Sequence, residues 1–481
     1  MSDVALDPLP AAPSGVDADT AAPAVEDGDG VWSPGRRRLT TALVLTITLV
    51  AFESLAIATV MPVVSDDLGG LGLYGWVFSG FFLGSLLGIV LAGRAADRRG
   101  TRFPFAVGLA LFAVGLVVGG AAQSMPMLVA GRVAQGMGAG VIPAVAYTSV
   151  GRAYPAAMRP RVFAVFSSAW VIPGVVGPAA ASAIAGWSSW RVVFLALLPL
   201  VAVAAALALP VLSDRVPGTE DRDGAAPASG RDDRPRDAVV LVLGAALVLG
   251  GLGAHQIPVV VALVAVGGVL AAWAFVRLVP TGTVSFHPGL PAAIAVRGVL
   301  TFAFFGTDAY VSLAVTEAHD APTWVAGLAL TGATLAWTAA AWIQQRLVVR
   351  RGPRWIVRRG FAVLAAGIAL TAVALGPVPV GLLVAAWTLG GLGIGLCYAP
   401  ISATVLGEAA PGQEGKASAS LQLTDVLGVS LGTGLAGVFV AVGEGRDWAT
   451  ASSLTLAFVV TGLVALAGVV AAGRLPRRLP G

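Results

Sequence analysis

The chain has 481 residues, of which 57% are hydrophobic and only 12% charged, with a net charge of +4 and a mean hydropathy of +0.86. Soluble domains carry about 25% charged residues, so this composition excludes an ordinary soluble protein and predicts a polytopic membrane protein. The single cysteine, Cys397, excludes an intrachain disulfide and a cysteine metal cluster. The three histidines are scattered without ligand spacing, so no metal or other cofactor is expected.

Residues 1–37 are predicted to form a disordered cytoplasmic tail. The first 35 are acidic and rich in Pro and Ala, and they lack the basic start and the apolar core of a signal peptide. The excess of Ala, Gly and Val, with Lys416 as the only lysine, suggests GC-rich coding and a bacterial source.

Fourteen apolar runs follow, most of them long enough to cross about 30 Å of hydrocarbon. The segment 238–279 is too long for one span and is broken at "GGLGAHQIP", so two short spans are expected there. The predicted spans are residues 40–63, 75–93, 104–122, 127–149, 162–185, 191–212, 238–254, 257–279, 291–314, 323–343, 359–376, 379–401, 418–442 and 449–473.

Arginine-rich loops alternate with arginine-poor loops when fourteen spans are threaded through a bilayer. By the positive-inside rule, both termini are then cytoplasmic in the plasma membrane, and the net positive charge reflects topology rather than nucleic-acid binding. The predicted organisation is an all-α protein with an N-terminal six-helix bundle (38–212), a flexible cytoplasmic linker (213–237), two inserted helices (238–280) and a C-terminal six-helix bundle (290–475).

The two six-helix bundles appear as an internal repeat in the sequence. "LVAGRVAQGMGAG" at 128–140 aligns with "LVAAWTLGGLGIG" at 383–395, an offset of 255 that also places Glu53 on Asp308. "GRAADRRGTR" aligns with "QRLVVRRGPR" at an offset of 252. A chance match between Gly-rich helices is the alternative, but two polar motifs and an acid-on-acid match favour two pseudo-symmetric halves.

Several motifs point to one family. Residues 93–102 read G-R-A-A-D-R-R-G-T-R, residues 132–138 read R-V-A-Q-G-M-G, and Glu53 stands nine residues before Pro62. In these motifs the chain resembles the major facilitator superfamily, specifically its fourteen-helix drug:proton antiporter branch, over residues 38 to 475. The branch usually has Asp where Glu53 stands.

The fifth-span signature of the branch, G-x-x-x-G-P-x-x-G-G, is only partly present. Gly177 and Pro178 match it, but Pro173, Ala181 and Ser182 replace its other glycines. Small residues allow close helix contacts, so this region and its repeat are predicted to let the two halves cross tightly. The helix-packing residues expected are Gly136, Gly174, Gly177, Pro178, Gly428 and Gly432.

The resemblance implies a latch between the two halves at the cytoplasmic motif, with topology control by its arginines as the simpler alternative. The repeated copy has Val349 where Asp97 would be expected, so one latch is predicted rather than two. The motif residues expected to form it are Gly93, Asp97, Arg98, Gly100 and Arg102.

Glu53 is a charged residue in the middle of the otherwise apolar first span. Because such a charge costs about 2.5–3.5 kcal/mol at the centre of a bilayer helix, its presence suggests a function. A buried carboxyl group can exchange a proton near neutral pH, and the resemblance implies a coupling role for this acid. Its depth allows contact with Arg132 on the fourth span. Packing by Glu53 and snorkelling by Arg132 are the alternatives. Asp308 and Asp425 complete the predicted proton-coupling set.

The candidate substrate cavity is lined by residues near these acids. Ser418, Gln422 and Asp425 form one polar stripe on an apolar helix, which suits a water-filled cavity. Arg297 is expected to snorkel to the inner interface instead. The aromatic candidates, which could equally face lipid, are Phe52, Trp170, Phe304 and Tyr310.

These features predict a monomeric, proton-coupled secondary transporter that exports amphipathic or cationic organic compounds across the membrane. Export of a lipid or an endogenous metabolite is the alternative, and a non-transporting membrane sensor or scaffold is a weaker one. An enzyme is not expected, because no nucleophile–base pair is apparent. The expected partners are a small organic substrate, protons and the lipid bilayer.

The topology gives a first testable prediction. A cysteine introduced as Ala225→Cys, in a chain whose Cys397 is replaced by serine, should react with a membrane-impermeant maleimide in inverted vesicles but not in intact cells. Labelling from outside intact cells would contradict the cytoplasmic placement of the linker.

Overall fold

The computed structural model describes residues 30–33, 36–154, 158, 162, 165–166, 169–212, 233–254, 256–410 and 413–478. Most of the predicted tail and linker lies outside these residues. The described residues contain helices and no strand. The helices of the N-terminal part are α1 (Arg37–Leu68), η1 (Leu71–Leu73), α2 (Tyr74–Arg99), α3 (Arg102–Gly120), α4 (Met125–Ala153), α6 (Val171–Trp187), α7 (Trp190–Leu195) and α8 (Leu198–Ala208).

The rest of the chain contains two inserted helices and a second bundle. Its helices are α9 (Arg234–Leu252), α10 (Ile257–Leu278), α11 (Leu290–Leu313), η3 (Ala314–Ala318), α12 (Thr323–Arg351), α13 (Pro353–Val373), α14 (Val380–Gly407), α15 (Glu414–Glu444), α16 (Thr450–Ala471) and η4 (Ala472–Arg474).

The expected membrane spans are found as helices. Thirteen helical stretches among the described residues are long and apolar enough to cross a bilayer, and the shorter helix Ile172–Trp187 stands where the remaining span was predicted. The sixth span, Trp190–Ala208, is long enough to cross the membrane once, but it consists of two consecutive helices, α7 and α8. Pro199, in the first turn of α8, explains this break, because proline has no N–H to continue the preceding helix.

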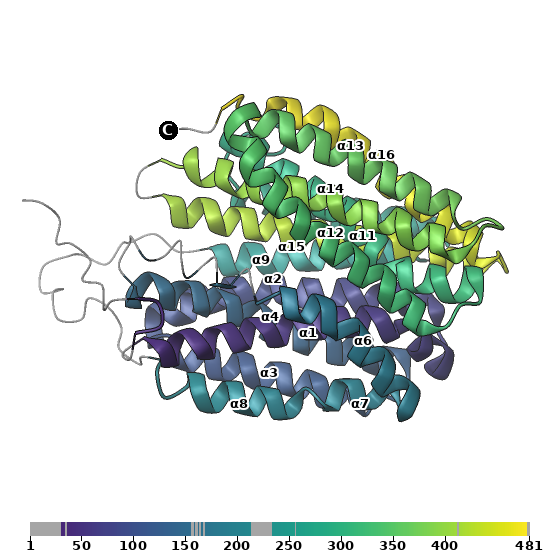
Figure 1. Ribbon diagram of the computed structural model, residues 1–481, viewed down its shortest axis with the longest axis horizontal. Helices are drawn as coiled ribbons and strands as arrows, with labels where there is room; N and C mark the ends of the chain where they lie inside the picture. The colour runs from purple at the N-terminus through teal and green to yellow at the C-terminus, as the bar shows by residue number, and fades with distance from the viewer. Residues whose placement is uncertain are drawn as a thin grey trace, which may run out of the picture.

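The two six-helix bundles lie side by side, the purple-to-teal one below the green-to-yellow one in Figure 1. They meet along α2 and α15, and along α6 and α12. The inserted helix α9 packs against both α2 and α15, in an apolar cluster that includes Leu83, Leu241 and Leu423. The start of α1 and the end of α16 lie at the same end of the molecule.

Close packing at equivalent glycines shows the repeat in three dimensions. In the first half, Gly136 of α4 faces the backbone of Phe81 on α2, so that an added Cβ would collide with the Phe81 carbonyl oxygen. In the second half, Gly391 of α14 faces the carbonyl oxygen of Ala333 on α12 in the same way. The halves are therefore pseudo-symmetric in their internal helix contacts, as the sequence predicted.

The contacts between the halves differ in part from the expectation. Gly174 of α6 does approach Thr334 of α12 across the interface. Gly428 and Gly432, however, pack against α11 of their own half, where the carbonyl oxygens of Gly298 and Phe302 leave no room for a Cβ.

The crossing of α2 and α15 depends on a pair of glycines that the sequence reasoning missed. A Cβ added at Gly75 would stand 2.7 Å from the Cα of Gly437. Near Gly177, by contrast, the nearest atoms belong to Leu55 and Phe52 of α1 in the same half, at 3.7 Å or more.

The repeated glycine contacts give a second prediction. Gly136→Ala and Gly391→Ala should each destabilise the protein by about 1–3 kcal/mol, because the added methyl group meets a rigid backbone carbonyl. Gly268→Ala is the control, since a Cβ there would meet nothing within 4 Å. Cys397 is fully buried, so a thiol-reactive fluorophore can report thermal unfolding. Equal unfolding temperatures for Gly136→Ala and Gly268→Ala would contradict this packing.

Candidate functional site

A buried ion pair lies at the middle of the N-terminal bundle. Glu53 is 16 residues from the start of α1 and has no exposed surface, which places it ~24 Å along the helix. The guanidinium of Arg132 on α4, only 2% exposed, forms the ion pair with Glu53. Arg132 also donates to Gln135 Oε1 at 2.8 Å and to the Val77 carbonyl at 3.1 Å, and it lies 4.1 Å above the ring centre of Phe81. The pair is therefore sealed from solvent and fixed by α2 and α4.

One oxygen of the carboxylate has no partner. Glu53 Oε1 receives the Arg132 donor, whereas Glu53 Oε2 and the nearby Gln135 Nε2 have no hydrogen-bond partner in the described part of the chain. Buried polar atoms are nearly always satisfied. A proton on Oε2 would break no existing hydrogen bond, so this oxygen is the one able to take it.

The equivalent acid in the C-terminal bundle has a different partner. Asp308 of α11 occupies the repeat position of Glu53, and its Oδ1 accepts a hydrogen bond from Trp387 Nε1 at 2.8 Å. Trp387 of α14 stands at the repeat position of Arg132. The second half thus replaces a charged guanidinium by a neutral indole, and Asp308 itself is half-buried.

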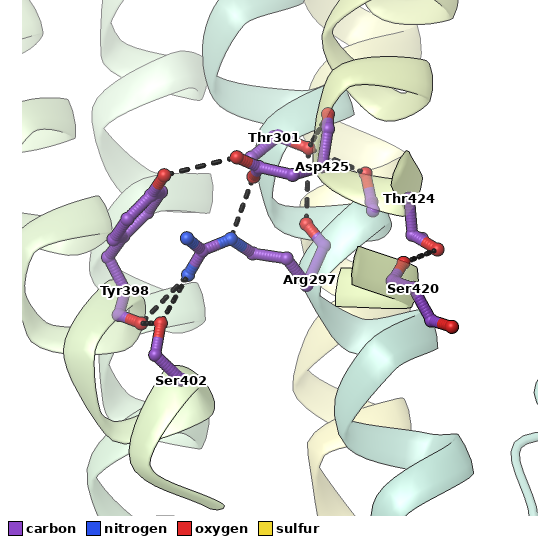
Figure 2. A network of polar contacts seen from close by, with 8 residues as sticks. Arg297, Thr301, Tyr398, Ser402, Ser420, Thr424 and Asp425 are labelled. Atoms are coloured by element: carbon purple, nitrogen blue, oxygen red, sulfur yellow. Dashed lines mark hydrogen bonds and ion pairs between the residues drawn. The ribbon is translucent and has the colours of Figure 1, made fainter. Parts of the chain in front are cut away.

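A third polar cluster joins α11, α14 and α15 (Figure 2). Arg297 Nε donates to Asp425 Oδ1 at 2.7 Å, and Arg297 Nη1 donates to the Tyr398 carbonyl at 2.8 Å and to Ser402 at 3.3 Å. Tyr398 closes the ring through its hydroxyl, which donates to Asp425 Oδ2 at 3.1 Å. The Thr301 hydroxyl donates to the Asp425 carbonyl at 3.0 Å.

The placement of Arg297 corrects a prediction. Its side chain does not snorkel to the membrane interface but is 4% exposed inside the bundle. Asp425 and Tyr398 satisfy the guanidinium there, and the ring centre of Tyr398 lies 3.1 Å from its central carbon. Asp425 is itself 19% exposed, so one side of this ion pair can be reached by solvent.

The predicted cavity residues do not all face open space. Phe52 and Gln422 are half-buried, and Trp170 is 46% exposed. Phe304 is buried and stacks on Trp387.

Tyr310 departs most from the expectation that it lines a cavity, because it is completely buried at the junction of the two halves. Its hydroxyl donates to the Thr433 carbonyl at 2.8 Å, and its ring lies 5.3 Å from that of Tyr74 on α2. Tyr310 therefore joins α11 to α2 and α15.

The motif at the end of α2 is only partly described. Gly100 caps α2 with φ of 72°, a left-handed conformation that favours glycine. Gly93 is exposed and has no atom within 4 Å of an added Cβ, so the close approach expected there is not seen. Arg98 and Arg102 are exposed, and the Asp97 side chain lies outside what the structure describes.

Sequence reasoning missed Trp387 and Tyr398 as site residues. Trp387 could have been found from the repeat, because the offset that aligns Glu53 with Asp308 also aligns Arg132 with Trp387. Tyr398 has no such signal, since it is one aromatic residue in an apolar span and is placed only by the packing of α14.

Comparison with known proteins agrees with this architecture. Residues 43–230 match the family model described as Major Facilitator Superfamily. A protein of Mycobacterium tuberculosis named a probable multidrug-efflux transporter is 28% identical over 466 residues, covering 92% of this chain and 96% of the relative. The family-model match and this relative support a member of the major facilitator superfamily. They indicate a membrane transporter rather than an enzyme.

Other relatives of this transporter match over shorter stretches or in fold alone. The multidrug transporter protein MdtP of Bacillus subtilis is 29% identical over 169 residues, 35% of this chain and 32% of the relative. The solved structure of a bacterial homologue of the human lysosomal transporter Spinster, inward-facing and unoccupied, superimposes with a TM-score of 0.64 at 13% identity. That match covers 92% of this chain and 96% of the other, and it shows the shared fold.

The third cluster gives a prediction about stability. Asp425→Leu leaves the Arg297 guanidinium buried without its counter-charge and should cost about 3–5 kcal/mol. The double variant Arg297→Leu/Asp425→Leu should recover most of that loss, because no buried charge remains. Unfolding followed by Cys397 reactivity measures both.

The exposed pair Arg191–Asp67, whose side chains are 35% and 47% exposed, supplies the matched control. Asp67→Leu should lower the unfolding temperature much less than Asp425→Leu, because an exposed ion pair contributes little to stability. A double variant no more stable than Asp425→Leu would contradict the ion-pair account of this cluster.

Proposed function

We propose that this transporter exports amphipathic or cationic organic compounds in exchange for protons, as a member of the fourteen-helix drug:proton antiporter branch. The observation that carries the proposal is the sealed Glu53–Arg132 ion pair at the middle of α1 and α4. The similarity to a probable multidrug-efflux transporter over nearly the whole chain supports the substrate class.

The ion pair provides a charge change that a proton can control. With Glu53 ionised, the pair is neutral overall and can stay in a low-dielectric bundle. With Glu53 protonated on Oε2, the Arg132 guanidinium is left with an uncompensated positive charge. That state favours rearrangement of α1 against α4, and it also disfavours a second cation nearby. Proton binding and cation binding therefore oppose each other, as an antiporter requires.

The proton gradient supplies enough energy for such an exchange. Each proton that moves inward yields about 2.3 kcal/mol per 100 mV of membrane potential. A pH difference of one unit adds about 1.4 kcal/mol per proton. Export of a neutral compound against a tenfold gradient costs about the same 1.4 kcal/mol, so one proton can drive it. For a monovalent cation exchanged for one proton the two electrical contributions cancel, so a pH difference of one unit sustains about a tenfold gradient.

The cytoplasmic motif at residues 93–102 is proposed to latch the two halves in one conformation. Asp97 lies near the end of α2. Arg132 contacts Val77 near the start of the same helix, about 20 residues or ~30 Å away along the helix axis. The role of Asp97 in this proposal is to time the conformational change and not to bind substrate.

Substrate export itself is tested with everted membrane vesicles. Vesicles that contain the transporter should accumulate fluorescent organic cations when respiration acidifies their lumen, and a protonophore should abolish the accumulation. Vesicles without the transporter are the control. Accumulation that persists undiminished with the protonophore would contradict proton coupling.

Replacement of the central acid gives the sharpest prediction of this proposal. Glu53→Gln keeps the size of the side chain but cannot ionise, so uphill export driven by a pH gradient should fall at least tenfold, to background. Substrate counterflow, which needs no net change in protonation, should persist. Glu53→Asp should be intermediate, because the carboxyl group remains one methylene further from Arg132. Both activities are measured in proteoliposomes.

The unfolding temperature of each variant controls for a loss of fold. Uphill export by Glu53→Gln at the wild-type rate would show that Glu53 is not an essential coupling group. In that case Asp308 and Asp425, the other two acids of the predicted proton-coupling set, become the candidates that carry the proton.

A further inference from the structure

The two halves of the transporter treat their equivalent acids differently. Glu53 is compensated by the positive guanidinium of Arg132. Asp308 receives only the N–H of Trp387, at 2.8 Å. An indole donates a hydrogen bond but has no charge, so Asp308 keeps its full negative charge whenever it is ionised.

The ion pair of the C-terminal bundle leaves Asp308 without a positive partner. Asp425, the other acid deep within the C-terminal bundle, is paired with Arg297 at 2.7 Å. Among the described residues, Asp308 forms no ion pair. It is half-buried rather than sealed. Of the two acids deep within the described part of the C-terminal bundle, Asp308 is thus the one without a positive partner, and part of its surface is exposed.

Aromatic rings extend from this carboxylate along the C-terminal bundle. Phe304, one turn before Asp308 on α11, stacks on Trp387 with ring centres 5.0 Å apart. Trp337 of α12 lies 5.5 Å from Phe304, and Tyr398 lies 5.2 Å from Trp337. Trp337 and Tyr398 are half-buried, so part of this aromatic wall is open. On α14 the wall extends from Trp387 to Tyr398, ~16 Å along the helix axis.

A carboxylate beside aromatic faces suits one class of ligand. Organic cations gain from an opposite charge and from the negative faces of aromatic rings, and both effects are stronger away from water. A neutral aromatic compound gains only from the rings. The wall and Asp308 therefore discriminate between ligands of equal size by their charge.

We propose that Asp308 is the cation-selectivity residue of this transporter: it binds the positive charge of an aromatic or alkylated onium substrate, whose apolar body lies on the half-buried ring of Trp337. The buried rings of Phe304 and Trp387 connect Trp337 to Asp308. Proton coupling then belongs to Glu53–Arg132, and Asp308 is not the second proton site that its repeat position suggests. The inference rests on the proposed function for the export of organic compounds, and it adds a division of labour between the two symmetry-related acids.

Two probes of similar size separate charge from shape. Tetraphenylphosphonium is a permanent cation, and triphenylphosphine oxide is neutral. Binding of each is measured to the purified full-length transporter in lipid nanodiscs, where no membrane potential can mimic affinity. Asp308→Asn should weaken tetraphenylphosphonium binding about tenfold or more, as expected for one lost charge interaction. Triphenylphosphine oxide binding should change less than about threefold.

Further variants keep the test independent of folding. Asp308→Glu should retain most of the tetraphenylphosphonium affinity, because the charge remains. Trp387→Arg copies the arrangement of the N-terminal half and should weaken tetraphenylphosphonium binding as Asp308→Asn does. Trp337→Leu should weaken both probes, because it removes a ring from the wall. Cys397 reactivity checks that each variant is folded.

Three results would overturn the inference. The first is a wild-type transporter that does not bind tetraphenylphosphonium; proton-driven export of other compounds would then leave the proposed function standing. The second is an equal loss of both probes in Asp308→Asn, which would mean a role in packing. The third is wild-type binding by Asp308→Asn combined with failed uphill export, which would make Asp308 a coupling acid.

Discussion

The structure depends on the constraint that a charge inside a membrane bundle needs a partner. Glu53 and Arg132 meet this constraint at the centre of the N-terminal half, where neither side chain is more than 2% exposed. Each alone would cost several kcal/mol in the bilayer, and together they are neutral. The same pairing that makes the charges tolerable makes them sensitive to one proton, because protonation of Glu53 removes the compensation. In the proposed mechanism, stability and proton coupling therefore arise from the same contact.

The repeat places a second acid at Asp308, but the two halves have diverged around a common frame. The frame is the set of glycines on α4 and α14, whose missing side chains let the backbones of α2 and α12 approach. Within it, Arg132 is replaced by Trp387, and Arg297 and Asp425 form an ion pair in the C-terminal half. The repeat therefore keeps the position of the two acids, Glu53 and Asp308, but not the charge of the residue that contacts each of them. This difference allows the two equivalent acids to have different roles.

Much of this architecture can be predicted from the sequence, because an apolar run of about 20 residues in a membrane protein is expected to form a spanning helix. The spans, the repeat and the matching depths of Glu53 and Arg132 all follow from spacing. The break between α7 and α8, the Arg297–Asp425 pair and the Gly75–Gly437 crossing do not. They depend on how each helix is rotated and which neighbour it meets, and Gly-rich helices without a marked apolar face do not reveal that rotation. For this reason the sequence predicts Arg297 at the membrane interface, whereas its side chain lies inside the bundle.

The central claim is that a proton on Glu53 and a bound substrate exclude each other. The most direct test is to add substrate to the purified transporter in a weakly buffered solution, slightly acidic, and to follow the pH with an indicator dye. The account predicts that the wild-type protein releases protons when substrate binds, and that Glu53→Gln binds the same substrate without releasing them. Equal proton release from both proteins would contradict the account, because the protons would then come from another group.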